Sequence, residues 1–173
     1  MIALIYYLTK GRKKDNNKKS KQKGILLLGG LDNRAGDLKI DKQVELVKKG
    51  IDSSIDTKGF RYVDIEGILN AIEQNPNYSV MLFSAGCKYA DKVAEKMKEM
   101  KNSLDNLYIL EPYHSGGTTT KAVRKAVEMG VPSKNVYVGS GASTGVGIIE
   151  NPSKTPSCSP SHWCSLTEVA KFV

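Results

Sequence analysis

The sequence predicts an α/β domain, in which a parallel sheet of about five strands is doubly wound with helices in a three-layer arrangement. Short apolar runs alternate five times with segments whose apolar residues recur at the helical period of about 3.6 residues. The runs are apolar throughout, which is typical of parallel strands buried on both faces of a sheet. Strands and helices that alternate in this way predict a sheet covered by helices on both sides.

The individual elements follow from where each apolar or helical pattern begins and ends. Strands are expected at residues 24–31, 60–63, 80–83, 107–110 and 135–138, and helices around residues 40–51, 64–75, 85–100, 118–130 and 163–173. The segment 139–161 is rich in glycine, serine and proline, and we expect it to be a long loop.

Length and charge indicate one domain, at residues 24–173. A chain of 173 residues has room for a single hydrophobic core, and 40% hydrophobic content is ordinary for a globular protein. The formal charge of +8 lies almost entirely in residues 1–23, where eight basic residues face one acidic residue. The remaining 150 residues carry 18 basic and 17 acidic groups, so we expect no specific nucleic-acid partner.

Residues 1–23 are expected to form a flexible, apolar-plus-basic N-terminal arm. Its first eight residues are apolar but too few to cross a bilayer, which needs about 20. They also precede the lysines, the reverse of a secretory signal, so no secretion signal is expected. The lysine-rich remainder is predicted to be a disordered linker. The arm could stay free, bind a protein partner or belong to a membrane anchor; a cytoplasmic location or an intracellular assembly is expected.

A serine stands at the corner between a predicted strand and a predicted helix in residues 78–90, Y-S-V-M-L-F-S-A-G-C-K-Y-A. This is the geometry of a nucleophile elbow, in which a helix N-terminus directs N–H groups at a developing oxyanion. Gly86 would permit the tight packing of such a turn. The usual motif is G-x-S-x-G, and Leu82 occupies its first glycine position. A plain helix N-cap is the alternative interpretation of Ser84.

Further polar residues follow the other predicted strands. The carboxyl ends of parallel strands meet at one edge of the sheet, where ligands bind. These ends carry Gly29-Gly30-Leu31, Ser84, Glu111 and Ser140, and His162 follows in the loop after the last strand. Serine, acid and histidine in this chain order match the order found in α/β-hydrolases.

On these residues the chain resembles the α/β-hydrolase superfamily, as a reduced, lidless serine-esterase-like domain. L-F-S-A-G-C is similar to the esterase elbow G-F-S-A-G-G, I-L-L-L-G-G-L to the strand and loop of the first oxyanion donor, and S-H-W to the histidine loop. The resemblance implies that Ser84 is the nucleophile and His162 its general base. It also implies an oxyanion hole made by the N–H groups of Ala85 and of Gly30 or Leu31.

Glu111 is the candidate for the acid of this triad, because it ends the strand after the serine. A surface carboxylate before Pro112 is the alternative interpretation of this residue. In the family the acid usually follows a later strand, where this chain offers only residues 140–144, none of them acidic, and, further on, Glu150. His114 could compete for the role of the base, although an exposed or helix-capping histidine is the more common situation.

Nucleotide and metal sites are not expected. The glycine-rich stretches G-S-G-A-S-T-G-V-G and S-G-G-T-T-T fit neither the P-loop nor the dinucleotide-binding pattern. Cys158, His162 and Cys164 could supply three zinc ligands but lack a fourth. Three aspartates near the end of the first strand, at positions 32, 37 and 41, are explained by loop and capping roles. An odd number of cysteines favours a reducing compartment.

Two functions follow from these expectations. The first is a small serine hydrolase that acts on a small ester or amide substrate through an acyl-enzyme, without a cofactor or metal. The second is a non-catalytic α/β-hydrolase-like structural module of a larger assembly, for example a virus particle. Such a module would dock through the arm at residues 1–23.

Overall fold

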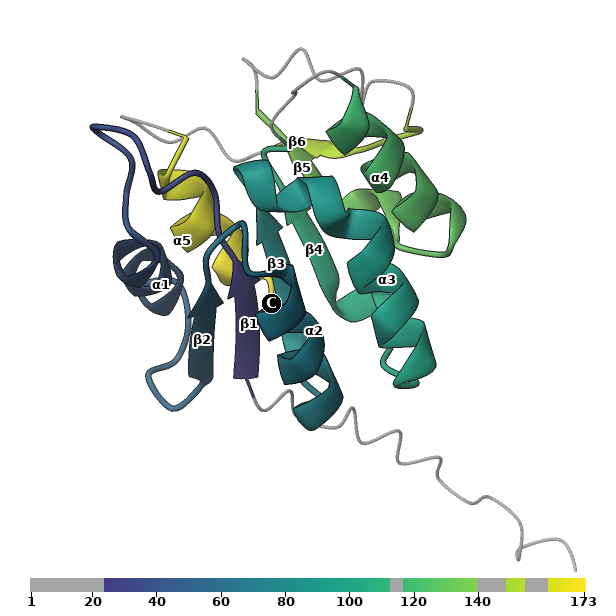
Figure 1. Cartoon of the computed structure of the whole chain (residues 1–173), viewed down its shortest axis with the longest axis horizontal. Coiled ribbons are helices and arrows are strands. Elements are labelled where there is room, and N and C mark those ends of the chain that lie inside the picture. Colours follow the sequence, from purple (N-terminus) through teal and green to yellow (C-terminus); the bar gives the residue numbers. More distant parts are fainter. Residues whose placement is uncertain (1–23, 113–116, 140–148, 155–161) are drawn as a thin grey trace, which may run out of the picture.

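The computed structural model describes residues 24–112, 117–139, 149–154 and 162–173 (Figure 1). The predicted arm at residues 1–23 and much of the predicted loop lie outside the described residues. The same holds for three residues considered above, His114, Ser140 and Cys158.

Within the described residues, one all-parallel sheet of six strands has the order β2-β1-β3-β4-β5-β6 (Figure 1). The strands are β1 (Gly24–Leu28), β2 (Asp56–Phe60), β3 (Ser79–Phe83), β4 (Leu107–Leu110), β5 (Val136–Val138) and β6 (Ser153–Lys154). The predicted α/β class with a parallel sheet is confirmed. The sixth strand is additional, because two residues of the predicted loop pair with β5.

Helices connect the strands, as the alternating pattern predicts. The α-helices are α1 (Ile40–Lys48), α2 (Ile65–Gln74), α3 (Ala90–Glu99), α4 (Thr118–Glu128) and α5 (Cys164–Ala170). Three 3₁₀ helices also occur in the described chain, η1 (Ser84–Tyr89), η2 (Leu104–Asn106) and η3 (Ser133–Asn135). The predicted helix after Ser84 therefore begins with a six-residue 3₁₀ segment, longer than the three or four residues usual for that geometry.

The position of β2 differs from the prediction. Tyr62 and Val63 were expected in this strand, but it ends at Phe60, and the Val63 side chain is 51% exposed. The strand D-T-K-G-F lies at the edge of the sheet, beside β1 only. An edge strand faces the core on fewer sides, so its sequence needs no continuous apolar run, and hydrophobic pattern alone misplaces it.

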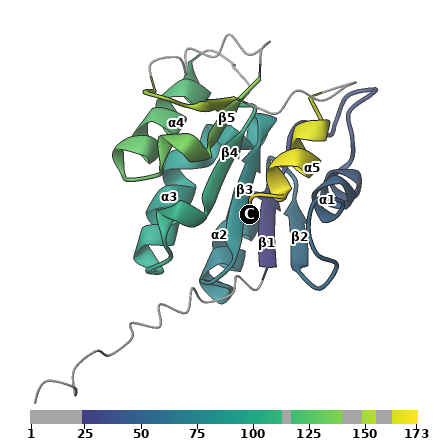
Figure 2. The ribbon, with the colours of Figure 1, turned by 180° about the vertical axis from the view of Figure 1, so that it is seen from behind.

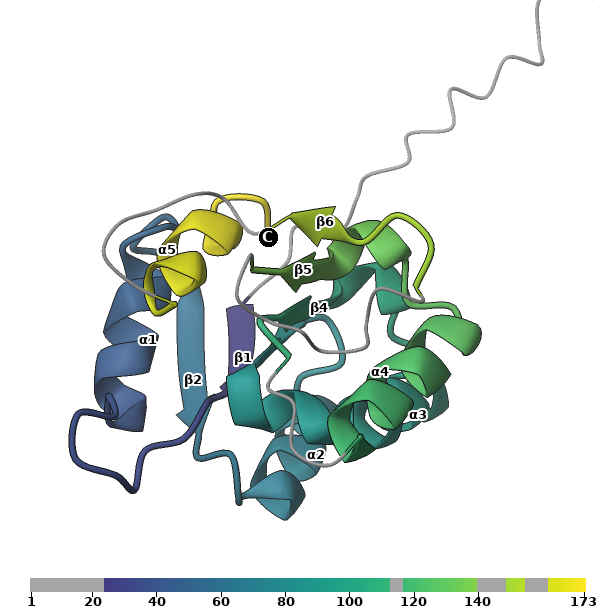
Figure 3. The same ribbon diagram turned by 90° about the horizontal axis from the view of Figure 1, so that it is seen from above.

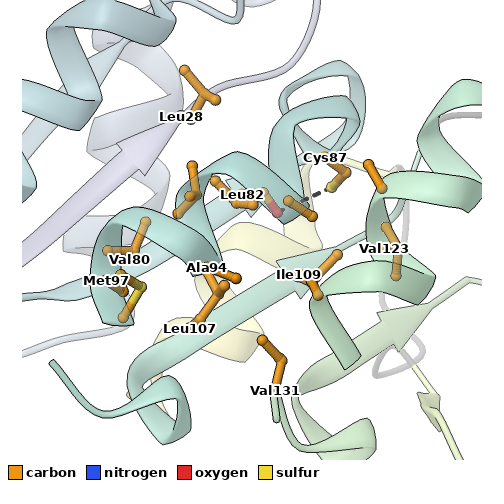
Figure 4. Close-up of a cluster of buried hydrophobic side chains, with 14 of the residues drawn as sticks. Leu28, Val80, Leu82, Cys87, Ala94, Met97, Leu107, Ile109, Val123 and Val131 are labelled. Carbon is orange, nitrogen blue, oxygen red and sulfur yellow. Dashed lines mark hydrogen bonds between the residues drawn. The ribbon is translucent and has the colours of Figure 1, made fainter. Parts of the chain in front are cut away.

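Two buried apolar clusters line the sheet, because successive strand residues point to opposite faces. The first joins alternate residues of β1, β3 and β4 to α2, α3 and α4; among its members are Leu28, Val80, Leu82, Cys87, Ala94, Met97, Leu107, Ile109, Val123 and Val131 (Figure 4). The second joins the intervening strand residues to α1 and α5 (Figure 2); its buried members are Ile25, Leu27, Val47, Met81, Phe83, Leu110, Leu166, Val169 and Ala170.

The C-terminal helix α5 packs beside α1, although the two helices are far apart in the sequence (Figure 3). The Thr167 hydroxyl donates to the Leu46 carbonyl at 2.8 Å. Gly50 lies so close to α5 that a Cβ atom there would lie 2.9 Å from Ala170 Cβ. This packing fixes the position of α5, and His162 lies two residues before the first residue of this helix.

The strand order creates a switch point between β1 and β3. From β1 the chain crosses to β2 on one side, and from β3 it crosses to β4 on the other. Loops that leave the carboxyl ends of such strands diverge, and ligands of open α/β sheets bind in the crevice between them. The residues that follow β1 and β3 are therefore the first place to look for a site.

Candidate active site

Ser84 directly follows β3 and begins the 3₁₀ helix η1. Its φ angle is 51°, in the left-handed region that non-glycine residues rarely adopt. The residue is only 5% exposed, so its strained backbone is enclosed by packing. A serine with this backbone at a strand-to-helix corner has the local geometry that a nucleophile elbow needs.

Glycines allow β1 to approach this corner closely. A Cβ atom on Gly86 would lie 2.6 Å from the Leu28 carbonyl oxygen, so the position has no room for a side chain. A Cβ on Gly30 would lie 3.0 Å from Ser84 Cβ. Leu82, at the first glycine position of the elbow motif, is fully buried in the first apolar cluster instead. The close approach expected at Gly86 is therefore present, without a glycine at position 82.

Glu111 directly follows β4, the strand beside β3, and also has a left-handed backbone with φ 47°. It is 8% exposed, so the alternative interpretation as a surface carboxylate is wrong. The backbone N–H of Gly139 donates to Glu111 Oε2 at 3.1 Å, and the Glu111 N–H donates to the Tyr137 carbonyl at 2.8 Å. A Cβ on Gly139 would collide with the carboxylate. These contacts hold the acid at the edge where Ser84 lies.

His162 lies beside both of these strands. Its Nδ1 atom is 3.9 Å from Glu111 Oε2, and its ring centroid is 4.7 Å from that of Phe83, the residue immediately before Ser84. The Trp163 ring packs on the same phenylalanine at 5.3 Å. The structure thus brings together an acid and a histidine that are 51 positions apart in the sequence, next to the strand that ends in the predicted nucleophile.

Because the carboxylate lies on the Nδ1 side of the ring, the Nε2 atom of His162 is the nitrogen left for a nucleophile, as in serine hydrolases. Within the described residues, however, no hydrogen bond joins Ser84 to His162. Catalytic hydrogen bonds are often loose in ligand-free enzymes and tighten when substrate binds. The catalytic roles of Ser84, His162 and Glu111 stay predictions.

The predicted oxyanion donors differ in their hydrogen bonds. Ala85 is the second residue of η1, and the first N–H groups of a helix have no acceptor within it. The Gly30 N–H instead donates to Gln43 Oε1 at 2.9 Å. The Leu31 N–H makes no hydrogen bond to any residue that the structure describes. Of the two predicted alternatives at this loop, only the Leu31 N–H thus lacks a partner within the described residues, and the oxyanion role of either residue stays a prediction.

Cys87 is a buried thiol with a structural role. Its Sγ lies 3.3 Å from the carbonyl oxygens of both Leu82 and Leu110, near the ends of β3 and β4 (Figure 4). Burial raises the pKa of the Cys87 thiol far above its usual range, and the nearby Glu111 carboxylate acts in the same direction. The thiol therefore stays protonated and does not compete with Ser84 as a nucleophile.

The other cysteine in the described chain, Cys164, is disulfide-bonded, whereas Cys87 is free. This disulfide was not anticipated from the sequence. A disulfide-bonded sulfur is also no thiolate ligand for zinc, and Cys158 lies outside the described residues. Among the residues with described positions, no group of three or more His, Cys, Asp or Glu side chains could hold a metal ion.

Several residues that shape this site escaped the sequence analysis. Gln43 was missed although the sequence carries a signal for it: it is a polar residue on the apolar stripe of α1, between Ile40 and Val47. Arg61 pairs with the buried Asp32, which was expected only to cap or turn the loop. Gly139 was also missed, and its signal in the sequence is weaker than that of Gln43, because a glycine at the end of a strand is common.

Comparison with family models, with curated proteins and with solved structures gives no match for this chain. The parallel α/β architecture is compatible with an α/β-hydrolase-like fold, but no relative supports membership of that superfamily. In the part of the chain that the structure describes, no helix combines the length and the apolar character needed to cross a membrane.

Proposed function

We propose that this chain is a small serine hydrolase of the esterase or acyl-hydrolase type, built on a three-layer, lidless α/β-hydrolase-like domain. The observation that carries the proposal is the approach of the buried Glu111 carboxylate to Nδ1 of His162, at 3.9 Å, beside the strand that ends in Ser84. The left-handed backbone of Ser84 adds support, because buried strain at a strand end is typical of functional residues.

The proposed reaction forms and hydrolyses an acyl-enzyme. Ser84 Oγ attacks the carbonyl carbon of a small ester or amide while Nε2 of His162 accepts the hydroxyl proton. The protonated histidine gives that proton to the leaving alcohol or amine, and the acyl group stays on Ser84. A water molecule then attacks the acyl carbon while His162 accepts its proton. His162 returns this proton to Ser84 Oγ as the bond from Oγ to the acyl carbon breaks and the acid leaves.

The remaining residues stabilise charge during these steps. Glu111 holds the His162 ring by its Nδ1 side and stabilises the imidazolium that forms. The N–H groups of Ala85 and Leu31 stabilise the negative oxygen of the tetrahedral intermediate. The chemistry uses only side chains and backbone of this chain, so the proposal includes neither a cofactor nor a metal.

A fluorophosphonate probe tests the proposal directly. The wild-type chain should be labelled at Ser84 and should hydrolyse p-nitrophenyl acetate, and Ser84→Ala should lose both, with hydrolysis falling about 10⁴-fold or more. Ser79→Ala is the matched control, because Ser79 is a fully buried serine at the other end of the same strand. An unlabelled wild-type chain with a native circular dichroism spectrum would contradict the hydrolase.

One observation favours a second candidate function, a non-catalytic structural module of a larger assembly. Ser84 and His162 form no hydrogen bond to each other within the described residues, although both lie at the same edge of the sheet. As a structural module, the chain would dock into its assembly through residues 1–23. Deleting these residues should then abolish assembly and leave the Tm of the domain unchanged, whereas the hydrolase should keep its activity after the same deletion.

A further inference from the structure

The loop between β1 and α1 consists of residues 29–39 (Figure 3). Side chains hold it on both sides of the peptide that carries the Leu31 N–H. On one side, the Gly30 N–H donates to Gln43 Oε1 at 2.9 Å. Gln43 Nε2 donates in turn to the Leu38 carbonyl at 2.8 Å, so one amide side chain joins the two ends of the loop. Gln43 is completely buried on α1, and both ends of its amide are hydrogen-bonded.

On the other side of the same peptide, Asp32 fixes the loop to the end of β2. Arg61 Nε lies 2.6 Å from Asp32 Oδ2, and a second guanidinium nitrogen lies 3.1 Å from Oδ1. Lys39 Nζ donates to the Asp32 backbone carbonyl. Asp32 is 2% exposed, and the hydrogen bond from Arg61 lowers the pKa of its carboxyl group. The carboxylate thus stays charged and bound at neutral pH.

Glycines set how closely this loop approaches the predicted nucleophile. A Cβ on Gly29 would lie 2.6 Å from Gln43 Oε1, so glycine is needed for the amide to reach the loop. Gly30 lies against Ser84 and the Phe83 ring. Leu31, the proposed oxyanion donor, is the next residue in the chain after Gly30. By binding the Gly30 N–H, the Gln43 side chain therefore fixes the residue that contacts Ser84 and directly precedes this donor.

We infer that Gln43 is a positioning residue, which holds the Leu31 N–H in place for the oxyanion that forms above Ser84. Arg61 completes the arrangement through Asp32. The inference rests on the proposed function, because it assigns Gln43 a task in that reaction. Gln43 is buried behind the loop, so it contacts no substrate and acts only through the peptide that it holds.

A donor fixed before the reaction stabilises the transition state without reorganising, whereas a loose donor loses much of that effect. Displacing a positioned group by about 1 Å can lower the rate about 100-fold. Because the oxyanion forms after substrate has bound, removing Gln43 should lower kcat and leave KM nearly unchanged.

The test compares Gln43→Leu with Asn135→Leu in the full-length chain. Both residues are buried amides whose Nδ2 or Nε2 groups bind backbone carbonyls, but Asn135 binds Asp105 and Leu107 at the amino ends of the strands. We expect kcat for p-nitrophenyl acetate to fall about 10- to 100-fold in Gln43→Leu, with KM within about twofold. Asn135→Leu should keep kcat within about twofold of the wild type, although its Tm should fall by about as much as that of Gln43→Leu.

A second measurement does not depend on activity. The ¹⁵N order parameter of the Leu31 amide should fall from about 0.85 in the wild type towards 0.6 in Gln43→Leu, and stay high in Asn135→Leu. An unchanged order parameter, or equal kcat values in the two variants, would overturn the inference. A wild type that hydrolyses nothing would contradict the proposed function instead, while the order parameter still decides whether Gln43 positions Leu31.

If Gln43→Leu fails to fold, Arg61→Lys replaces it, because the Arg61 side chain is 54% exposed and the charge is kept. Lysine lacks the two-pronged contact with Asp32, so kcat should fall about 3- to 10-fold and the Leu31 order parameter should fall with it. Wild-type values of both quantities in Arg61→Lys would overturn the inference.

Discussion

The two ends of the sheet use buried polar groups in different ways. At the amino ends of the strands, Asn135 binds the carbonyls of Asp105 and Leu107, and Asn102 binds the Tyr78 carbonyl at 3.1 Å. These amides join η2 and the loop before β3 to their neighbours. None of these five residues has a positive φ angle. At this end, the buried amides of Asn102 and Asn135 therefore hold loops together through hydrogen bonds, whereas the buried Ser79 hydroxyl at the start of β3 has no partner within the described residues.

At the carboxyl ends, buried polar groups occur together with backbone strain. Lys101 and Asn151, which precede β4 and β6 at the amino ends, also have positive φ angles, but both residues are exposed. Ser84 and Glu111 are buried, follow the two central strands and have little freedom to relax. A strained non-glycine residue costs about 1–3 kcal/mol, which the surrounding packing must offset, so the strain at Ser84 and Glu111 supports the proposal that this end carries the site.

The largest expected effect tests whether Glu111 belongs to a catalytic group. Glu111→Gln should lower kcat about 10³- to 10⁴-fold, because an amide neither stabilises the imidazolium nor holds the same tautomer of His162. Kinetics with p-nitrophenyl acetate would measure the loss, and Glu128→Gln, at an exposed position of α4, is the control. Activity within tenfold of the wild type in Glu111→Gln would remove Glu111 from the site and leave the strain at the carboxyl end unexplained.

A smaller effect concerns the Asp32–Arg61 pair. The pKa of Asp32 is lowered from 3.8 chiefly by the hydrogen bond from Arg61, so the pair contributes stability above the ordinary carboxyl pKa and loses it as pH falls through the lowered value. Asp32→Asn should therefore lower the free energy of unfolding by about 1–3 kcal/mol at pH 7, and by less as pH falls below about 4.

Urea unfolding of the wild type and Asp32→Asn between pH 2.5 and pH 7 would measure this difference. Asp41→Asn, which removes an exposed carboxylate from the first turn of α1, should change stability by less than about 1 kcal/mol throughout. A difference between wild type and Asp32→Asn that is the same at both ends of the pH range would show that the charge of Asp32 does not stabilise the loop.

The smallest effect measures the strain at Ser84. Ser84→Gly should be more stable than Ser84→Ala by about 1 kcal/mol, because glycine adopts a φ of 51° without steric cost. The same pair at Ser133, which has no positive φ, should show the opposite order, by about 0.5–1 kcal/mol. Thermal unfolding of the four variants gives both differences. Equal or reversed order at Ser84 would mean that the carboxyl end is no more strained than the amino end.

The sequence predicted most of the fold because the elements are locally consistent. The strands at 80–83 and 107–110 are continuous apolar runs, and the structure places β3 and β4 within one residue of them. Helical periodicity similarly located α1, α2 and α4. The serine at the corner after β3 could also be recognised, because a strand, a small-residue turn and a helix follow one another directly in the chain.

The partners of the candidate residues could not be predicted, because they depend on contacts between distant segments. A single sequence does not show that α5 returns to α1, and it is this packing that brings His162 to within 3.9 Å of the Glu111 carboxylate. The same limit applies to Gln43 and to Arg61, whose partners are loop atoms. The strands β2 and β6 were misplaced or missed because sheet edges carry little hydrophobic pattern.

For this protein, the sequence by itself determined the α/β class, the parallel sheet and a serine at the end of a central strand. These features depend on the period of apolar residues and on turn chemistry, which act over a few neighbouring positions. Tertiary structure alone decided that Glu111 is buried beside His162 and that Gln43 takes the N–H of Gly30. Such pairs form because strand order and helix packing, both set by the whole core, bring remote side chains within contact distance.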